Sequence, residues 1–113
     1  ANIITIEKKA ELDALLEKHH KRPVVVDFYA TWCEPCRQLA PSVEQLANEH
    51  RKDIVFAKCD VDDGEALALE MDIQSVPTFA IFSEGKLMEK WSGAEIAALK
   101  SKLEPLIPSK KSN

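Results

Sequence analysis

Apolar residues along this chain follow two spacings, short continuous runs and helical repeats. The run from Val24 to Ala30 has the length and composition of a strand covered on both faces of a sheet. In contrast, Leu12, Leu15 and Leu16 recur at the spacing of one helical face. Because runs and repeats alternate along the chain, the pattern predicts an α/β fold around a largely buried sheet.

Cap and turn signals bound the other elements. Thr5 is expected to cap the first helix and Asp62 the third, and Pro41 should kink the second because it lacks a backbone donor. The turn at residues 83–86 predicts an antiparallel hairpin. The predicted strands span residues 2–5, 24–30, 54–61, 78–82 and 87–91. The predicted helices span residues 6–19, a segment that starts at Cys33 and Cys36 and ends near residue 50, residues 62–71 and residues 94–106.

Length and charge narrow the range of functions. The 113 residues, 45% of them hydrophobic, suffice for one domain with one core. The net charge of −4 is spread along the chain, which predicts neither a nucleic-acid surface nor a polybasic membrane contact. No apolar run approaches the roughly 20 residues of a membrane span. We expect a monomer with one domain over residues 1–108 and a short polar tail over residues 109–113.

The cysteine count bears on the compartment. Of the three cysteines only Cys33 and Cys36 are close in sequence, so a disulfide scaffold is not predicted. An odd thiol suits a reducing compartment, and the N-terminus has no signal-peptide pattern. We therefore expect a cytoplasmic protein, with the mitochondrial matrix second if a presequence has been removed. Cys59 lies among apolar strand residues and is expected to be a small buried hydrophobic residue.

The segment Trp32–Cys36 is the main candidate for chemistry. It joins the apolar strand to a helix, whose first turn offers unpaired N–H groups and the positive end of the dipole. That environment favours a thiolate at Cys33, which we expect to be the more exposed cysteine and the nucleophile. Cys36 would then resolve the mixed disulfide, and Pro35 would hold the two sulfurs near each other. A zinc site needs two more ligands, and only Cys59 and three scattered histidines remain, so redox chemistry is favoured.

Asp27 is the second candidate, a carboxylate inside an apolar strand. Burial raises the pKa of a carboxyl group, which would bring Asp27 into the range for proton transfer at neutral pH. The alternative is a structural carboxylate bonded to the backbone or to a lysine. Lys58 interrupts the apolar pattern of the next strand and is a candidate charge partner, although an exposed edge lysine gives the same pattern.

Five separated segments resemble the thioredoxin family in sequence, order and spacing, from near residue 20 to near residue 107. They are residues 25–33, Pro35-Cys36-Arg37, residues 57–62, Val76-Pro77-Thr78-Phe79, and the two glycines Gly85 and Gly93. The resemblance implies the thioredoxin fold, a central mixed five-stranded sheet flanked by four helices. It also implies a protein thiol-disulfide oxidoreductase that reduces disulfides in partner proteins through a Cys33-Cys36 dithiol/disulfide cycle.

The resemblance assigns further roles. Asp27 would lie behind Cys36, reached through water, and accept its proton. Pro77 would follow a cis peptide bond and face the disulfide, so that Val76 offers its backbone to an extended partner segment. The alternative for Pro77 is a plain strand-entry proline. Trp32 and Gly93 would complete the contact surface, Trp32 as an exposed platform and Gly93 by allowing a partner backbone to approach closely.

The same resemblance implies no bound cofactor. Electrons would come from NADPH through a thioredoxin reductase, and the other partners would be disulfide-containing proteins. Two alternatives remain open. One is an oxidase or isomerase of the same fold. The other is a binding or regulatory module whose surface around Trp32, Val76, Pro77 and Gly93 holds a partner while the cysteines gate the contact.

Glu34 departs from the family pattern, which usually has glycine there. A carboxylate beside Cys33 disfavours the thiolate by like-charge repulsion, although solvent screening keeps the effect small. Glu34 is therefore expected to tune the redox properties modestly. Replacement Glu34→Gly should lower the pKa of Cys33, measured by thiolate absorbance in the reduced protein. A Cys33 pKa that stays the same or rises contradicts this interpretation.

Overall fold

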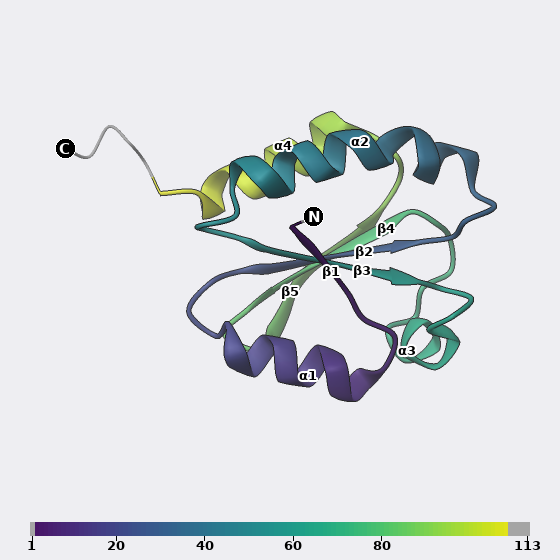
Figure 1. The fold of residues 1–113 in the computed structure, drawn as a ribbon, viewed down its shortest axis with the longest axis horizontal. Helices are drawn as coiled ribbons and strands as arrows, with labels where there is room; N and C mark the ends of the chain where they lie inside the picture. Colours follow the sequence, from purple (N-terminus) through teal and green to yellow (C-terminus); the bar gives the residue numbers. More distant parts are fainter. Residues whose placement is uncertain (1, 109–113) are drawn as a thin grey trace.

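A five-stranded mixed sheet forms the centre of the molecule in this computed structural model, which describes residues 2–108 (Figure 1). The predicted tail at residues 109–113 lies outside the described residues. The strand order is β1-β3-β2-β4-β5, with β1 to β3 parallel and β4 and β5 antiparallel to their neighbours. The strands are β1 Ile3–Thr5, β2 Val24–Tyr29, β3 Val55–Asp60, β4 Thr78–Ser83 and β5 Lys86–Ser92.

Two helices cover each face of the sheet. In Figure 1, α2 and α4 lie on one side and α1 and α3 on the other. The fold predicted from the thioredoxin resemblance is therefore confirmed. The bounds are α1 Lys9–Lys18, α2 Glu34–Glu49, α3 Glu65–Glu70 and α4 Ile96–Leu103, followed by a 3₁₀ turn at Glu104–Leu106. None of the helices within residues 2–108 has the length and apolar character to cross a membrane.

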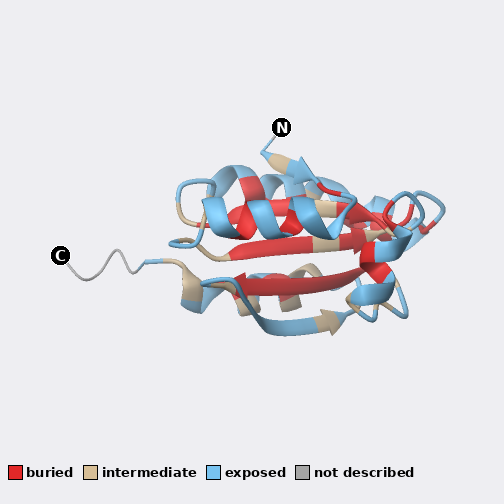
Figure 2. Cartoon of the chain, turned by 90° about the horizontal axis from the view of Figure 1, so that it is seen from below, coloured by how far each residue is buried: buried red, intermediate tan, exposed pale blue. Residues whose placement is uncertain are grey.

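Strand β2 is central because its side chains are buried on both faces. Val24, Val26 and Phe28 pack in the cluster under α1 and α3, whereas Val25 packs in the cluster under α2 and α4. Burial is concentrated in the inner strands and the inward faces of the helices, as Figure 2 shows. The two-sided burial explains the continuous apolar run in the sequence. The carboxyl end of β2, at Tyr29, leads directly into the loop before α2, which begins at Glu34.

The start of α1 differs from the prediction. The helix begins at Lys9, not at residue 6, and Thr5 is the last residue of β1 rather than a cap. The backbone N–H of Ile6 donates to the Lys58 carbonyl at 2.9 Å, which continues the pairing with β3. The Glu11 carboxylate accepts the free N–H groups of residues 7 and 8, at 2.7 and 3.0 Å. A long-range backbone bond thus delays the helix by three residues.

The expected Asp62 cap of α3 is also wrong. Gly64 is the N-cap residue, and the N–H of Asp62 instead donates to Asp60 Oδ1 at 2.8 Å. Two further bounds are adjusted. Helix α4 begins at Ile96 rather than 94, and α2 continues through Pro41 to Glu49.

Gly64 lies too close to the core for a larger residue. A Cβ at this position would lie 2.6 Å from Cys59 Sγ and 3.0 Å from the Glu7 carbonyl oxygen. Replacement Gly64→Ala should lower the free energy of unfolding by about 1–3 kcal/mol, measured by denaturant titration. In the double variant with Cys59→Ala, part of that loss should be recovered because the sulfur is gone. An unchanged midpoint for Gly64→Ala contradicts this packing.

Candidate redox site

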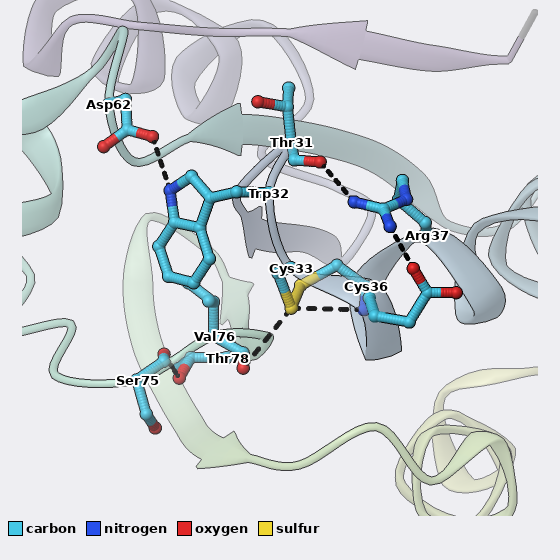
Figure 3. The surroundings of a disulfide bond; sticks show 10 residues. Thr31, Trp32, Cys33, Cys36, Arg37, Asp62, Ser75, Val76 and Thr78 are labelled. Atoms are coloured by element: carbon cyan, nitrogen blue, oxygen red, sulfur yellow. Dashed lines mark hydrogen bonds and ion pairs between the residues drawn. A yellow bond between two sulfur atoms is a disulfide. The ribbon is translucent and has the colours of Figure 1, made fainter.

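Cys33 and Cys36 lie at the junction of β2 and α2 and form a disulfide, with their Cα atoms 5.3 Å apart (Figure 3). Cys33 is the N-cap residue of α2, and its sulfur accepts the backbone N–H of Cys36 at 3.2 Å. A helix N-terminus stabilises negative charge through such unpaired donors and the dipole. The Cys33 sulfur therefore lies where a thiolate is favoured.

The two cysteines are buried to nearly the same extent, with exposed fractions of 5% for Cys33 and 7% for Cys36. The expectation that Cys33 is the more exposed cysteine is therefore wrong. Its sulfur lies 3.8 Å from the Val76 carbonyl oxygen, so the loop before β4 covers it. Access to Cys33 consequently depends on this loop.

The loop before β4 brings three predicted contact residues together. The Val76–Pro77 peptide bond is cis, and the Pro77 carbonyl accepts the N–H of Gly93 at 3.0 Å. Gly93 has φ of 123°, in the region that favours glycine, although a Cβ there would meet no atom within 4 Å. Backbone conformation, not crowding, thus accounts for glycine at this position.

Trp32 flanks the disulfide on the side of Val76, as Figure 3 shows. Its side chain is 67% exposed, and its indole N–H donates to Asp62 Oδ2 at 2.9 Å. The exposed ring agrees with the predicted platform. Sequence reasoning missed Asp62 as a residue of the site, because nothing in the local pattern shows that it reaches the indole.

Asp27 and Cys36 line the same cavity of about 180 Å³ between the sheet and α2. The Oδ1 atom of Asp27 is buried and has no hydrogen-bond partner within residues 2–108. Burial raises the pKa of the Asp27 carboxyl from 3.8 to about 7, against the opposing effect of the Lys58 charge. The net result is a carboxyl group that titrates near neutral pH, as proton transfer requires, while the role of Asp27 in proton transfer stays a prediction.

Lys58 is paired with Asp27 in register across β2 and β3, and both side chains line the cavity. Within the described residues the ammonium forms no ion pair with Asp27; it lies 5.7 Å from the centroid of the Tyr29 ring. The influence of Lys58 on Asp27 is therefore electrostatic rather than a direct salt bridge.

Glu34 does not stand alone at the start of α2. Its Oε1 pairs with Arg37 Nη2, and its Oε2 accepts the side-chain amide of Gln38 at 3.2 Å. Arg37 Nη1 also donates to the Thr31 carbonyl at 2.7 Å. The sequence analysis missed these partners, although the i, i+3 spacing of acid and base is a signal for the ion pair. The cation offsets part of the charge that Glu34 places beside Cys33.

The third cysteine is separate from this site. Cys59 packs in the cluster under α1 and α3, and burial raises the pKa of its thiol to about 11. It is the buried hydrophobic residue that the sequence predicts. Within residues 2–108 there is no group of three or more histidine, cysteine or acidic side chains placed to hold a metal ion.

The disulfide lies at a helix N-terminus, next to a loop with a cis-proline and to a cavity lined by a carboxyl group. This arrangement is typical of proteins that carry out thiol–disulfide exchange. The family model Thioredoxin matches residues 3–105 of the chain. The chain therefore belongs to the thioredoxin family.

Individual relatives agree with this assignment. The chain is 47% identical to a thioredoxin of Mycoplasmoides gallisepticum over 88 residues, which are 78% of this chain and 85% of that protein. It is 40% identical over 89 residues, 78% of this chain, to 19% of a bifunctional thioredoxin reductase/thioredoxin of Mycobacterium leprae. The structure superposes on Fasciola hepatica thioredoxin with a TM-score of 0.87 and 37% identity, covering 91% of this chain and 98% of that one.

Family membership settles the class of activity. The chain is a protein thiol–disulfide oxidoreductase, a protein-disulfide reductase, and its redox-active group is the disulfide. The structure places the cysteine pair, Asp27, Trp32 and the loop before β4 around one site.

The raised pKa of Asp27 gives the protein a specific pH dependence. The native carboxyl, with a pKa of about 7, binds a proton more readily than the unfolded one at 3.8. The free energy of unfolding should therefore fall as the pH rises through this window, by about 2–3 kcal/mol for this group between pH 5 and 9.

Denaturant titrations of the oxidised protein at several pH values measure this loss. Replacement Asp27→Asn removes the titration and should make the variant more stable than the parent at pH 9. Parallel pH profiles for the two proteins would contradict the raised pKa.

Proposed function

We propose that Cys33 attacks disulfides of partner proteins and Cys36 completes their reduction. The Cys33 thiolate bonds to one partner sulfur and releases the other as a thiolate. The Cys36 thiolate then attacks the Cys33 sulfur, which forms the Cys33–Cys36 disulfide and releases the second partner sulfur. Two electrons pass to the partner. The observation that carries this order of events is the N–H of Cys36 on the Cys33 sulfur at the start of α2.

The partner segment is proposed to dock beside Val76 in an extended conformation. Its backbone would pair with the loop before β4, in the manner of strand addition to an exposed edge. Trp32 would supply an exposed apolar contact on one side, and Gly93 would leave room for the backbone on the other. The loop would move with respect to the Cys33 sulfur, because that sulfur is buried in the oxidised state.

Asp27 is proposed to accept the proton of Cys36 as this thiol becomes the second nucleophile. A group with a pKa of about 7 takes and returns a proton at neutral pH. The cavity between Asp27 and Cys36 gives room for a water molecule to carry that proton. Lys58 would stabilise the charged form of Asp27 from the neighbouring strand.

The electron source is proposed to be NADPH, through a thioredoxin reductase. The relative in Mycobacterium leprae, in which both names apply to one polypeptide, supports this pairing. The protein is further proposed to act in electron transport as a cytoplasmic monomer. The odd thiol, buried and protected in the core, suits that reducing compartment.

Trapping the mixed disulfide tests the proposed cycle. Cys36→Ser is first reduced with dithiothreitol, freed of the reductant and mixed with insulin, and it should then accumulate a covalent complex through Cys33, visible on a non-reducing gel. Turnover is measured separately, with insulin as the disulfide substrate and dithiothreitol as reductant. Cys33→Ser should form no complex and lose turnover. The matched control is Cys59→Ser, which should keep full activity because this thiol is buried away from the site.

Two outcomes contradict the proposal. Turnover that survives in Cys33→Ser would favour a binding module in which the cysteines are not needed for function. Net oxidation of a reduced substrate by the parent protein, in place of reduction, would favour an oxidase or isomerase.

A further inference from the structure

Arg37 crosses from α2 to the loop that follows β2. One nitrogen of its guanidinium, Nη1, donates to the Thr31 carbonyl at 2.7 Å, and the other, Nη2, pairs with the Glu34 carboxylate. Figure 3 shows Arg37 on the flank of the disulfide opposite Trp32, with its guanidinium directed at Thr31. A side chain fixed at both ends of its planar group is held in one orientation.

This bridge joins two exposed residues that line the cavity shared with Asp27. Among the residues that line the cavity, Cys36 and Val43 are buried and Asp27 is half-buried, whereas Thr31 and Arg37 are exposed. Arg37 directly follows Cys36 in the chain, so its side chain lies at the end of the cavity nearest the second cysteine. The hydrogen bond from Arg37 to Thr31 joins two parts of the rim across that end.

We propose that Glu34 and Arg37 together cover the proton-transfer cavity, with Arg37 as the cover and Glu34 as the residue that holds it in place. Both are positioning residues, since neither touches the reacting sulfurs in this account. The family usually has glycine in place of Glu34, and glycine offers no carboxylate to hold the guanidinium. The inference rests on the proposed role of Asp27, and it assigns to this departure from the family pattern the control of water access to Asp27.

The two possible roles of Arg37, as a cover over the cavity and as a positive charge, predict opposite changes in the pKa of Asp27. If Arg37 acts as a cover, its removal exposes Asp27 to water, and the pKa of Asp27 falls. If Arg37 acts only through its positive charge, its removal disfavours the Asp27 carboxylate, and the pKa of Asp27 rises. This test requires that the other titratable groups facing the cavity keep the same charge during the titration. These groups are Tyr29, Cys36, Glu44 and Lys58.

The experiment therefore uses the oxidised protein, in which Cys36 does not titrate. Burial raises the pKa of the Tyr29 phenol, so Tyr29 stays neutral from pH 5 to 9. The ¹³C shift of the Asp27 carboxyl carbon is followed across this range by NMR. In the parent protein the midpoint should lie at about 7.

Replacement Arg37→Ala should lower that midpoint by about one pH unit. Arg37→Lys keeps the charge but cannot bond to Thr31 and Glu34 with one planar group, and it should lower the midpoint as well. The matched control is Gln38→Ala, which removes the other hydrogen bond of Glu34 and should leave the midpoint unchanged. A midpoint that rises or stays constant in both Arg37 variants overturns the proposal.

A kinetic readout separates this proposal from the proposed role of Asp27. The release of insulin from its mixed disulfide with Cys33 is measured against pH for the parent and for Arg37→Lys. The pH midpoint of the release rate should fall together with the NMR midpoint. If the NMR midpoint falls while the kinetic profile stays in place, the cover is confirmed and Asp27 is not the proton acceptor.

Discussion

The hydrogen bond from the Cys36 backbone to the Cys33 sulfur is the interaction on which the site depends. It exists because β2 ends and α2 begins within four residues, so that a sulfur takes the place of the usual N-cap oxygen. The sheet fixes the position of that junction, since β2 is buried on both faces and paired on both edges. The packing of the core thereby fixes the first turn of α2 next to the Cys33 sulfur.

The same junction brings together two opposing electrostatic effects. The start of α2 favours negative charge on the Cys33 sulfur. In contrast, burial disfavours negative charge on the Asp27 carboxyl group. A buried carboxyl without a partner destabilises the native state once it ionises, so its presence needs a functional reason. Proton exchange with the second cysteine gives one. Stability is lost at high pH in exchange for a group that titrates near neutrality.

Sequence reasoning found most of this arrangement and failed at particular places. The strands, the four helices and the cysteine pair follow from apolar runs, helical repeats and the family resemblance. Thr5 was wrong as a helix cap because the long-range bond from Ile6 to Lys58 continues the strand pairing of β1. Asp62 was wrong because its N–H donates to the Asp60 carboxylate and Gly64 takes the cap position of α3. The near-equal burial of the two cysteines depends on the loop at Val76, and the bond from Arg37 to Thr31 depends on how the loop after β2 turns. The spacing of residues along the sequence predicts neither the burial of the cysteines nor the bond from Arg37 to Thr31.

The pH dependence of Cys33 alkylation tests the central interaction most directly. The reduced protein is treated with iodoacetamide across a range of pH, and peptide mass spectrometry assigns the label to Cys33. If the first turn of α2 stabilises the thiolate, the apparent pKa of Cys33 lies clearly below the ordinary value of about 8.5. An apparent pKa at or above that value would show that the start of the helix does not activate the sulfur, and would contradict this account.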